Sequence, residues 1–289
     1  MTIRVVSLDG GGIKGALTAR ILSRLEAASP GWLARVDLFA GTSTGGILAL
    51  ALASELSPEA CVSLYRDRGP SIFAPRDFMD AIPGDEYVRA DYGSEGLRAA
   101  LVGIFGSRCL GDLNHDVLIP AFDLKRWQPK FFDREHDANA RIVDVALATS
   151  AAPTYFPIHA GKADGGLFAN NPSDSALAFL LAKGAKLSDV RMLSVGTGAS
   201  PVPAPGSDGD WGFRQWIVKD PHYLLSVLFD GSVLASHYRS KVQLSDRYVR
   251  VQPMLPERVE MDDPEKVSLL LDVADRVDLA EAMRLMASE

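Results

Sequence analysis

Two short apolar runs, each followed by clustered glycines and then by a helical pattern, constrain the fold more than any other feature of this chain. Residues 3–8 form a β-branched run that ends in three consecutive glycines, and residues 16–28 then carry apolar residues at helical spacing. The run 36–40 ends in a second glycine turn, and residues 47–54 are apolar on nearly every side. This alternation predicts an α/β fold with a mostly parallel central sheet sandwiched by helices.

The rest of the chain continues the same pattern. We expect further short strands at 117–123, 130–133 and 191–196, and helices over 174–183 and 264–286. Residues 242–244 and 248–251 flank a polar triplet and predict a β-hairpin.

One segment could divide the chain. Residues 199–210 are rich in Pro, Gly and Ser and read as a linker or loop. We predict a core over residues 3–198 and a C-terminal extension over 199–289. The extension should pack on the same domain, because its few strands would make a weak core alone.

Charge and hydropathy exclude several classes of protein. The 289 residues include 30 Lys and Arg against 37 Asp and Glu, a net charge of −7. We find no basic stripe of the kind that nucleic-acid binders carry, so no nucleic-acid partner is expected. The acidic excess also argues against tight, charge-driven adsorption to anionic membranes. No apolar run reaches the roughly 18 residues of a transmembrane helix, and the first residues are too quickly polar for a signal peptide. We expect a cytoplasmic protein, with peripheral membrane contact as a further option.

The cysteines indicate neither a disulfide framework nor a metal site. Cys61 and Cys109 are the only two in the chain, and isolated thiols of this kind fit a reduced compartment. No Cys/His cluster has zinc-ligand spacing. We therefore expect no metal and no cofactor.

The first glycine turn, residues 10–15, fits G-x-G-x-x-G between a strand and a helix. Three chemistries compete for this pattern. A phosphate loop would need Lys where Ala16 stands, and a dinucleotide site would need an acid at the end of the second strand, where only the early Asp37 is available. An oxyanion hole fits better, since glycine amides at a helix N-terminus can face a developing negative charge. A tight turn without chemistry stays the plain alternative.

The second glycine turn holds a candidate nucleophile. Residues 41–45 fit G-x-S-x-G, with Ser43 on a predicted strand-to-helix turn where flanking glycines permit a sharp bend. The alternative is that Thr42 or Ser43 only caps the following helix. A serine nucleophile needs a base. Of the five histidines only His159 lies near another motif.

A third glycine-backed turn offers a different base. In Asp164-Gly165-Gly166 the carboxylate could accept the serine proton directly, without histidine. A plain Asp-Gly turn is the alternative interpretation.

Four blocks in this order resemble the patatin-like phospholipases. The blocks are Asp9-Gly10-Gly11-Gly12-Ile13-Lys14-Gly15, Gly41-Thr42-Ser43-Thr44-Gly45-Gly46, Ala148-Thr149-Ser150-Ala151-Ala152-Pro153-Thr154-Tyr155-Phe156-Pro157, and Asp164-Gly165-Gly166 with Asn170-Asn171-Pro172. The resemblance implies an α/β sandwich with a Ser–Asp dyad, in which Ser43 is the nucleophile and Asp164 the base. It also implies an oxyanion hole from the amides of Gly11, Gly12 and Ile13. Lys14 departs from the arginine of many members, and Lys lacks the planar fork of Arg.

The resemblance also implies the activity. It points to a lipid acyl hydrolase of the phospholipase A type that forms an acyl-enzyme and contacts a membrane or micelle transiently. The alternatives are a cyclic-nucleotide-activated antiviral effector phospholipase, a non-catalytic storage member of the fold, and a nucleotide-binding α/β protein. The apolar stretch 211–229 could line an acyl groove or touch a bilayer. Residues 72–73 and 78–79 could cap the site. The sequence does not reveal the oligomeric state.

Overall fold

The computed structural model describes residues 2–74, 90–201, 209–220 and 222–287. Phe78 and Met79, proposed above as part of a cap, lie outside the described residues, as does most of the predicted linker. Within the described ranges, no helix is long and apolar enough to pass through a bilayer.

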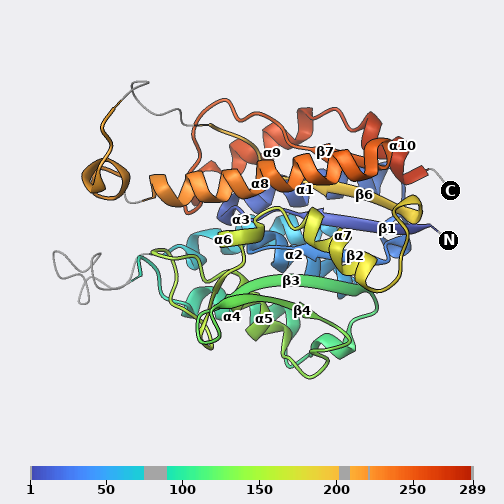
Figure 1. Ribbon diagram of the computed structural model, residues 1–289, viewed down its shortest axis with the longest axis horizontal. Helices are drawn as coiled ribbons and strands as arrows, with labels where there is room; N and C mark the ends of the chain where they lie inside the picture. Colours follow the sequence, from blue (N-terminus) through green and yellow to red (C-terminus); the bar gives the residue numbers. More distant parts are fainter. Residues whose placement is uncertain (1, 75–89, 202–208, 221, 288–289) are drawn as a thin grey trace.

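Strands and helices alternate along the chain as the sequence predicts (Figure 1). The strands are β1 (Ile3–Leu8), β2 (Leu38–Gly41), β3 (Asp116–Asp123), β4 (Gln128–Asp133), β5 (Lys162–Asp164), β6 (Val190–Val195) and β7 (Tyr248–Val251). The α-helices are α1 (Gly15–Ala28), α2 (Thr44–Ala53), α3 (Pro58–Ile72), α4 (Glu95–Phe105), α5 (Ile142–Thr149), α6 (Gly166–Ala169), α7 (Ser173–Ala182), α8 (Tyr223–Leu244), α9 (Val267–Arg276) and α10 (Ala280–Ala287). Residues Arg214–Val218 form a short π-helical turn, η7.

The seven strands form one mostly parallel sheet. Its order is β4-β3-β2-β1-β6-β7, and β5 pairs with β3 outside this path. Strands β2, β1, β6 and β7 run parallel to one another and to β3, whereas β4 and β5 are antiparallel to β3. The carboxyl ends of β1, β2, β3 and β6 therefore meet at one edge of the sheet, where loops of α/β proteins commonly form binding sites.

Both faces of the sheet are buried, which explains the continuous apolar runs in the strands. Along β1, Val6 and Leu8 pack into a core shared with α1, α2, α5 and α9. Val5, which points to the other face, packs with residues of α7 and with Leu244 at the end of α8. Figure 1 shows α7 and α8 passing in front of the sheet, opposite α1 and α2. The sandwich predicted from the sequence is confirmed.

Two predictions for the C-terminal region are wrong. Residues 242–244 end the long helix α8, and 248–251 form β7, which pairs in parallel with β6 instead of closing a hairpin. A short apolar run can belong to a strand or to a helix, and here burial of Leu244 under the sheet decides for the helix. The expected single helix over 264–286 is broken into α9 and α10.

The C-terminal region contacts the first half of the chain closely. Strand β7 extends the sheet beside β6, and α9 packs against α1. The proposed division at residue 198 stays a prediction, but these contacts place residues from beyond it beside the glycine turns.

Helix α2 begins so close to the end of β1 that a side chain would not fit between them. A Cβ atom on Gly45 would lie 2.3 Å from the carbonyl oxygen of Leu8. Because both partners are backbone, neither can rotate away.

We therefore expect Gly45→Ala to destabilise the protein by about 3 kcal/mol or more, as overpacking of a rigid site does. Urea unfolding followed by circular dichroism measures this change. Gly103→Ala is the matched control, since nothing lies within 4 Å of a Cβ at this exposed position in α4. The control should raise stability by up to about 1 kcal/mol. Equal effects of the two substitutions would contradict the interpretation.

Candidate active site

Ser43 occupies a strained turn between β2 and α2. Its backbone has φ 55° and ψ −124°, a left-handed conformation that residues other than glycine rarely adopt. The side chain makes no capping hydrogen bond to α2, and the Thr42 hydroxyl donates instead to the carbonyl oxygen of Ala169 at 2.6 Å. The helix-capping alternative is therefore wrong. The strain leaves the Ser43 hydroxyl facing a cavity.

Asp164 ends β5 and is almost fully buried beside Ser43. Burial raises the pKa of Asp164 to about 7, because the carboxylate loses its hydration. A hydrogen bond from the Gly166 amide, at 2.6 Å, and the nearby Ser43 hydroxyl favour the charged form and offset part of this increase in pKa. A pKa of about 7 lets this carboxyl group gain or lose a proton near neutral pH.

The glycine loop after β1 lines the same cavity. Among the described residues, no backbone acceptor is bonded to the amides of Gly11 and Gly12. Ile13 differs from the expectation, since its amide donates to the carbonyl oxygen of Met261 at 2.7 Å. The Ile13 amide is therefore already hydrogen-bonded, which leaves the amides of Gly11 and Gly12 as the candidate oxyanion donors.

The glycine loop is held from several sides. The Gly10 amide donates to the carbonyl oxygen of Asn170 at 3.0 Å, and the Thr197 hydroxyl donates to the Gly10 carbonyl at 3.2 Å. Just before the loop, Asp9 forms a two-pronged ion pair with Arg250 of β7, with N–O distances of 3.1 and 2.5 Å. Both side chains are more than nine-tenths buried. An ion pair this buried fixes the geometry of the strand end.

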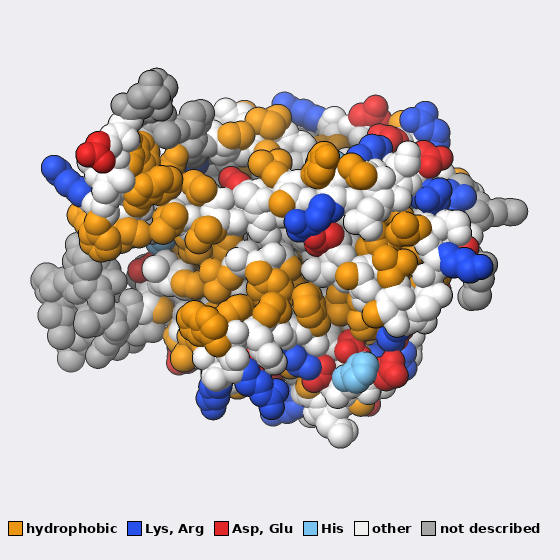
Figure 2. All heavy atoms as spheres, viewed as in Figure 1, with side chains coloured by type: hydrophobic (Ala, Val, Ile, Leu, Met, Phe, Trp, Pro, Cys, Tyr) orange, Lys and Arg blue, Asp and Glu red, His pale blue; other side chains and the backbone are white. Residues whose placement is uncertain are grey.

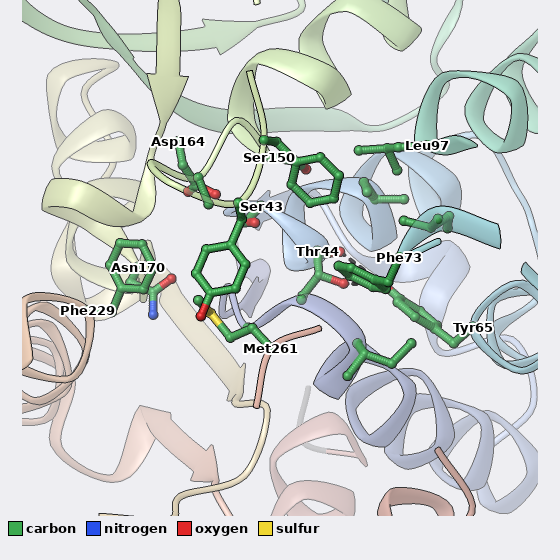
Figure 3. Close-up of a pocket in the computed structure, with 18 residues that line it drawn as sticks. Ser43, Thr44, Tyr65, Phe73, Leu97, Ser150, Asp164, Asn170, Phe229 and Met261 are labelled. Atoms are coloured by element: carbon green, nitrogen blue, oxygen red, sulfur yellow. Dashed lines mark hydrogen bonds between the residues drawn. The ribbon is translucent and has the colours of Figure 1, made fainter. Parts of the chain in front are cut away.

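Figure 3 shows Asp164 and Asn170 on one side of Ser43, and Phe73, Leu97 and Tyr65 on the other. These side chains line a cavity of about 650 Å³ that is partly open to solvent. Apart from the dyad and a few hydroxyl and amide groups, its walls are aliphatic and aromatic, with Ile13, Ile47, Ile72, Phe156, Phe229 and Met261 completing them. Ile72 and Phe73 thus lie at the site, as predicted. Such a cavity suits an extended apolar group next to one polar reacting centre.

Lys14, part of the first motif, does not line the cavity at Ser43. It lines a second, polar cavity of about 860 Å³, which shares Gly11 and Met261 with the first. Burial lowers the pKa of Lys14, and the charges of Asp230 and Glu260 offset part of this decrease. Lys14 therefore has no direct place at the reacting centre.

No histidine is among the residues that line the cavity at Ser43 in the described part of the chain. His159, the only histidine near a motif, bonds through Nε2 to Asp144 at 3.0 Å. The remaining motif glycines, Gly15, Gly41, Gly45, Gly165 and Gly166, lie where strands turn into helices around Ser43 and Asp164. Among the described residues that line the cavity, Asp164 is the one carboxylate.

The sequence assigned no role to three residues that support the site. Arg250 sits in a short apolar strand, and a charged residue in such a run could have signalled a buried partner. The Thr149 hydroxyl oxygen accepts a hydrogen bond from the Ser43 amide at 3.0 Å, and the Met261 carbonyl oxygen accepts one from the glycine loop. No local pattern marks Met261, because its contact with the loop spans the whole chain.

Known proteins resemble this chain in sequence and in fold. A family model described as patatin-like phospholipase matches residues 6–177. A cGAMP-activated phospholipase from Pseudomonas aeruginosa is 37% identical over 231 residues, which cover 74% of this chain and 68% of the relative. Protein teg from Priestia megaterium is 29% identical over 318 residues, covering 98% of this chain and 97% of that protein. Among solved structures, VipD from Legionella pneumophila matches with a TM-score of 0.50 at 12% identity, over 99% of this chain and 66% of that one. The likeness to VipD concerns the fold alone.

The Asp9–Arg250 pair generates a prediction about stability. We expect Arg250→Met to lower the free energy of unfolding by about 3–5 kcal/mol, because it leaves the Asp9 carboxylate buried without its partner. Arg134→Met, which breaks an exposed ion pair with Asp116, is the control and should cost less than about 1 kcal/mol. Chemical unfolding of both variants measures the two losses of stability. Adding Asp9→Asn to Arg250→Met should recover part of the loss, and no recovery would mean that the buried charge is not the cause.

Proposed function

The chain belongs to the patatin-like phospholipase family, and from this premise we propose that it is a serine-type lipid acyl hydrolase with a Ser43–Asp164 dyad. The observation that carries the proposal is that Ser43 lines the same cavity as a buried carboxylate, Asp164, whose pKa is about 7. A general base works best when its pKa lies near the working pH.

In the first step, Ser43 Oγ attacks the carbonyl carbon of an ester while Asp164 takes the hydroxyl proton. The amides of Gly11 and Gly12 donate to the oxyanion that forms. Each such donor contributes roughly 3–4 kcal/mol in other enzymes. The tetrahedral intermediate then collapses, the ester C–O bond breaks, and the leaving alcohol takes the proton from Asp164. The acyl group stays bonded to Ser43.

In the second step, water releases the acyl group. Asp164, again ionised, takes a proton from a water molecule while the water oxygen attacks the acyl carbon. The bond to Ser43 Oγ breaks, and the proton returns to Ser43. The products are a fatty acid and the restored dyad.

The cavity supports a lipid ester as the substrate. Its walls beyond Ser43 are apolar, with Phe73, Leu97 and Ile47 facing the space where an acyl chain would lie. The family itself acts on phospholipids, and we propose a phospholipid or a related lipid ester. Contact with a membrane or micelle surface, from a cytoplasmic location, completes this proposal.

A second candidate concerns regulation and is favoured by the relatives. The Pseudomonas aeruginosa protein with 37% identity is described as a cGAMP-activated phospholipase. We propose the same regulation here as an alternative to a constitutive enzyme. Under it, adding cGAMP should raise fatty-acid release at least about tenfold, as allosteric coupling of 1–3 kcal/mol allows. Equal rates with and without cGAMP would exclude this candidate.

We expect Ser43→Ala and Asp164→Asn each to lower kcat by at least about 10³-fold, because each removes a partner of the proton transfer. Fatty-acid release from mixed phospholipid vesicles and hydrolysis of a short-chain chromogenic ester measure the effect. Lys14→Met serves as a control outside the dyad and should change ester hydrolysis far less. Full activity of Ser43→Ala would overturn the mechanism.

The same assay gives a pH test. Asp164 must be ionised to accept the proton, so kcat/KM should rise about tenfold per pH unit below pH 7 and level off above it. A profile that levels off near pH 4, the ordinary value of an aspartate, would show that burial does not tune the base.

A further inference from the structure

The turn between β3 and β4 exposes an unusual side chain. Trp127 closes this turn, is 77% exposed and has φ 55°. Glycine and asparagine are the residues that normally occupy such a left-handed position. A bulky aromatic residue there costs backbone strain and gains little burial, which points to a role outside the fold.

Two cations accompany this side chain. Lys125 and Arg126 are exposed, and neither forms an ion pair with the described residues. Their amides are fixed by Asp123 Oδ1, which accepts both at 3.0 Å. The backbone that carries the two charges and the indole is therefore fixed. We call Lys125, Arg126 and Trp127 the basic tip.

The basic tip is connected to the proposed active site through packed side chains. The rings of Trp127 and Phe122 meet edge-on, with their centroids 5.5 Å apart. The rings of Phe122 and of Phe168 in α6 also meet edge-on, with their centroids 6.3 Å apart. Helix α6 directly follows the turn that carries Asp164. In addition, β3 pairs with β5 so that Ala121 faces Asp164.

A second exposed apolar residue lies in a loop that is hydrogen-bonded to the β3–β4 turn. The Leu124 amide donates to the carbonyl oxygen of Gly161 at 3.0 Å, which joins the turn to the loop before β5. In that loop Ile158 is 63% exposed, two residues after Phe156, which lines the cavity at Ser43. Figure 2 shows hydrophobic side chains gathered over the region of α6 and the β3–β4 pair, with Lys and Arg along their lower border.

We propose that the basic tip, together with Ile158, docks the protein on the surface of an anionic phospholipid bilayer. Indole rings favour the interface between headgroups and acyl chains, and lysine and arginine beside them attract anionic headgroups. The net charge of −7 opposes general adsorption to such a surface. Contact through a local positive tip would therefore also orient the protein, with the edge that carries Asp164 toward the lipid.

This inference rests on the proposed lipid substrate, and its test separates docking from catalysis. Vesicle binding is measured by flotation with Ser43→Ala as the parent, on phosphatidylcholine vesicles with and without phosphatidylserine. Trp127→Gly removes the indole and suits the left-handed backbone, so the fold should be kept. We expect this variant to bind both kinds of vesicle about tenfold or more weakly than the parent.

Charge reversal tests the second part of the tip. Lys125→Glu with Arg126→Glu should lower binding about tenfold or more on vesicles that contain phosphatidylserine, with a much smaller effect on phosphatidylcholine alone. Arg35→Glu with Lys186→Glu changes the net charge equally at exposed positions before β2 and β6, the opposite edge of the sheet. This control should bind like the parent.

Several results would overturn the proposal. One is vesicle binding by the tip variants that is as strong as that of the parent. Another is loss of binding in Phe213→Ala, a 74% exposed aromatic residue just before η7, with no loss in Trp127→Gly. A third is a dimer, seen by sedimentation, that Trp127→Gly dissociates without a change in vesicle binding.

Hydrolysis of the soluble ester by the tip variants on the wild-type background should stay within about twofold of wild type. If wild type releases no fatty acid while the tip variants still lose vesicle binding, the proposed function fails and the docking surface stands. If fatty acid is released from vesicles at the same rate with and without the basic tip, the docking inference fails and the proposed function stands.

Discussion

The site depends on how closely backbone segments approach one another where β1 and β2 end. A Cβ atom on Gly41 would lie 2.1 Å from the Gly45 carbonyl oxygen, and one on Gly45 would lie 2.3 Å from the Leu8 carbonyl oxygen. Only glycine permits this packing. It brings the strained turn of Ser43 beside the amides of Gly11 and Gly12, and every other feature of the site is arranged around that contact.

The crowded turns are held in place by the far end of the chain. Arg250 pairs with Asp9 at the start of the glycine loop, and the Met261 carbonyl accepts the Ile13 amide. Both residues lie beyond residues 6–177, which the family model matches. The C-terminal region therefore supports the loop on which the proposed oxyanion hole depends, and the structure gives it this role through the position of β7 beside β6.

Burial shapes the chemistry of the proposed base in the cavity, and exposed charge shapes the proposed contact with lipid at the surface. Inside, loss of hydration raises the pKa of Asp164 to about 7, which suits a base that works without histidine. Outside, a strongly acidic protein exposes Lys125 and Arg126 beside Trp127, next to the edge that carries Asp164. A lipid enzyme needs both an apolar site and a means to reach a charged surface, and the two features would supply them.

The sequence by itself determined the sheet-and-helix alternation and the three glycine turns, because strand runs, helical spacing and turn residues are local patterns. It also pointed to Ser43 and Asp164 as partners, through motif and family resemblance. The tertiary structure alone decided that Ile13 is engaged by Met261, that Lys14 faces a second cavity, and that residues 242–244 end a helix. These outcomes depend on strand order and on contacts between distant segments, which determine burial and hydrogen bonding and leave no periodic trace in the chain.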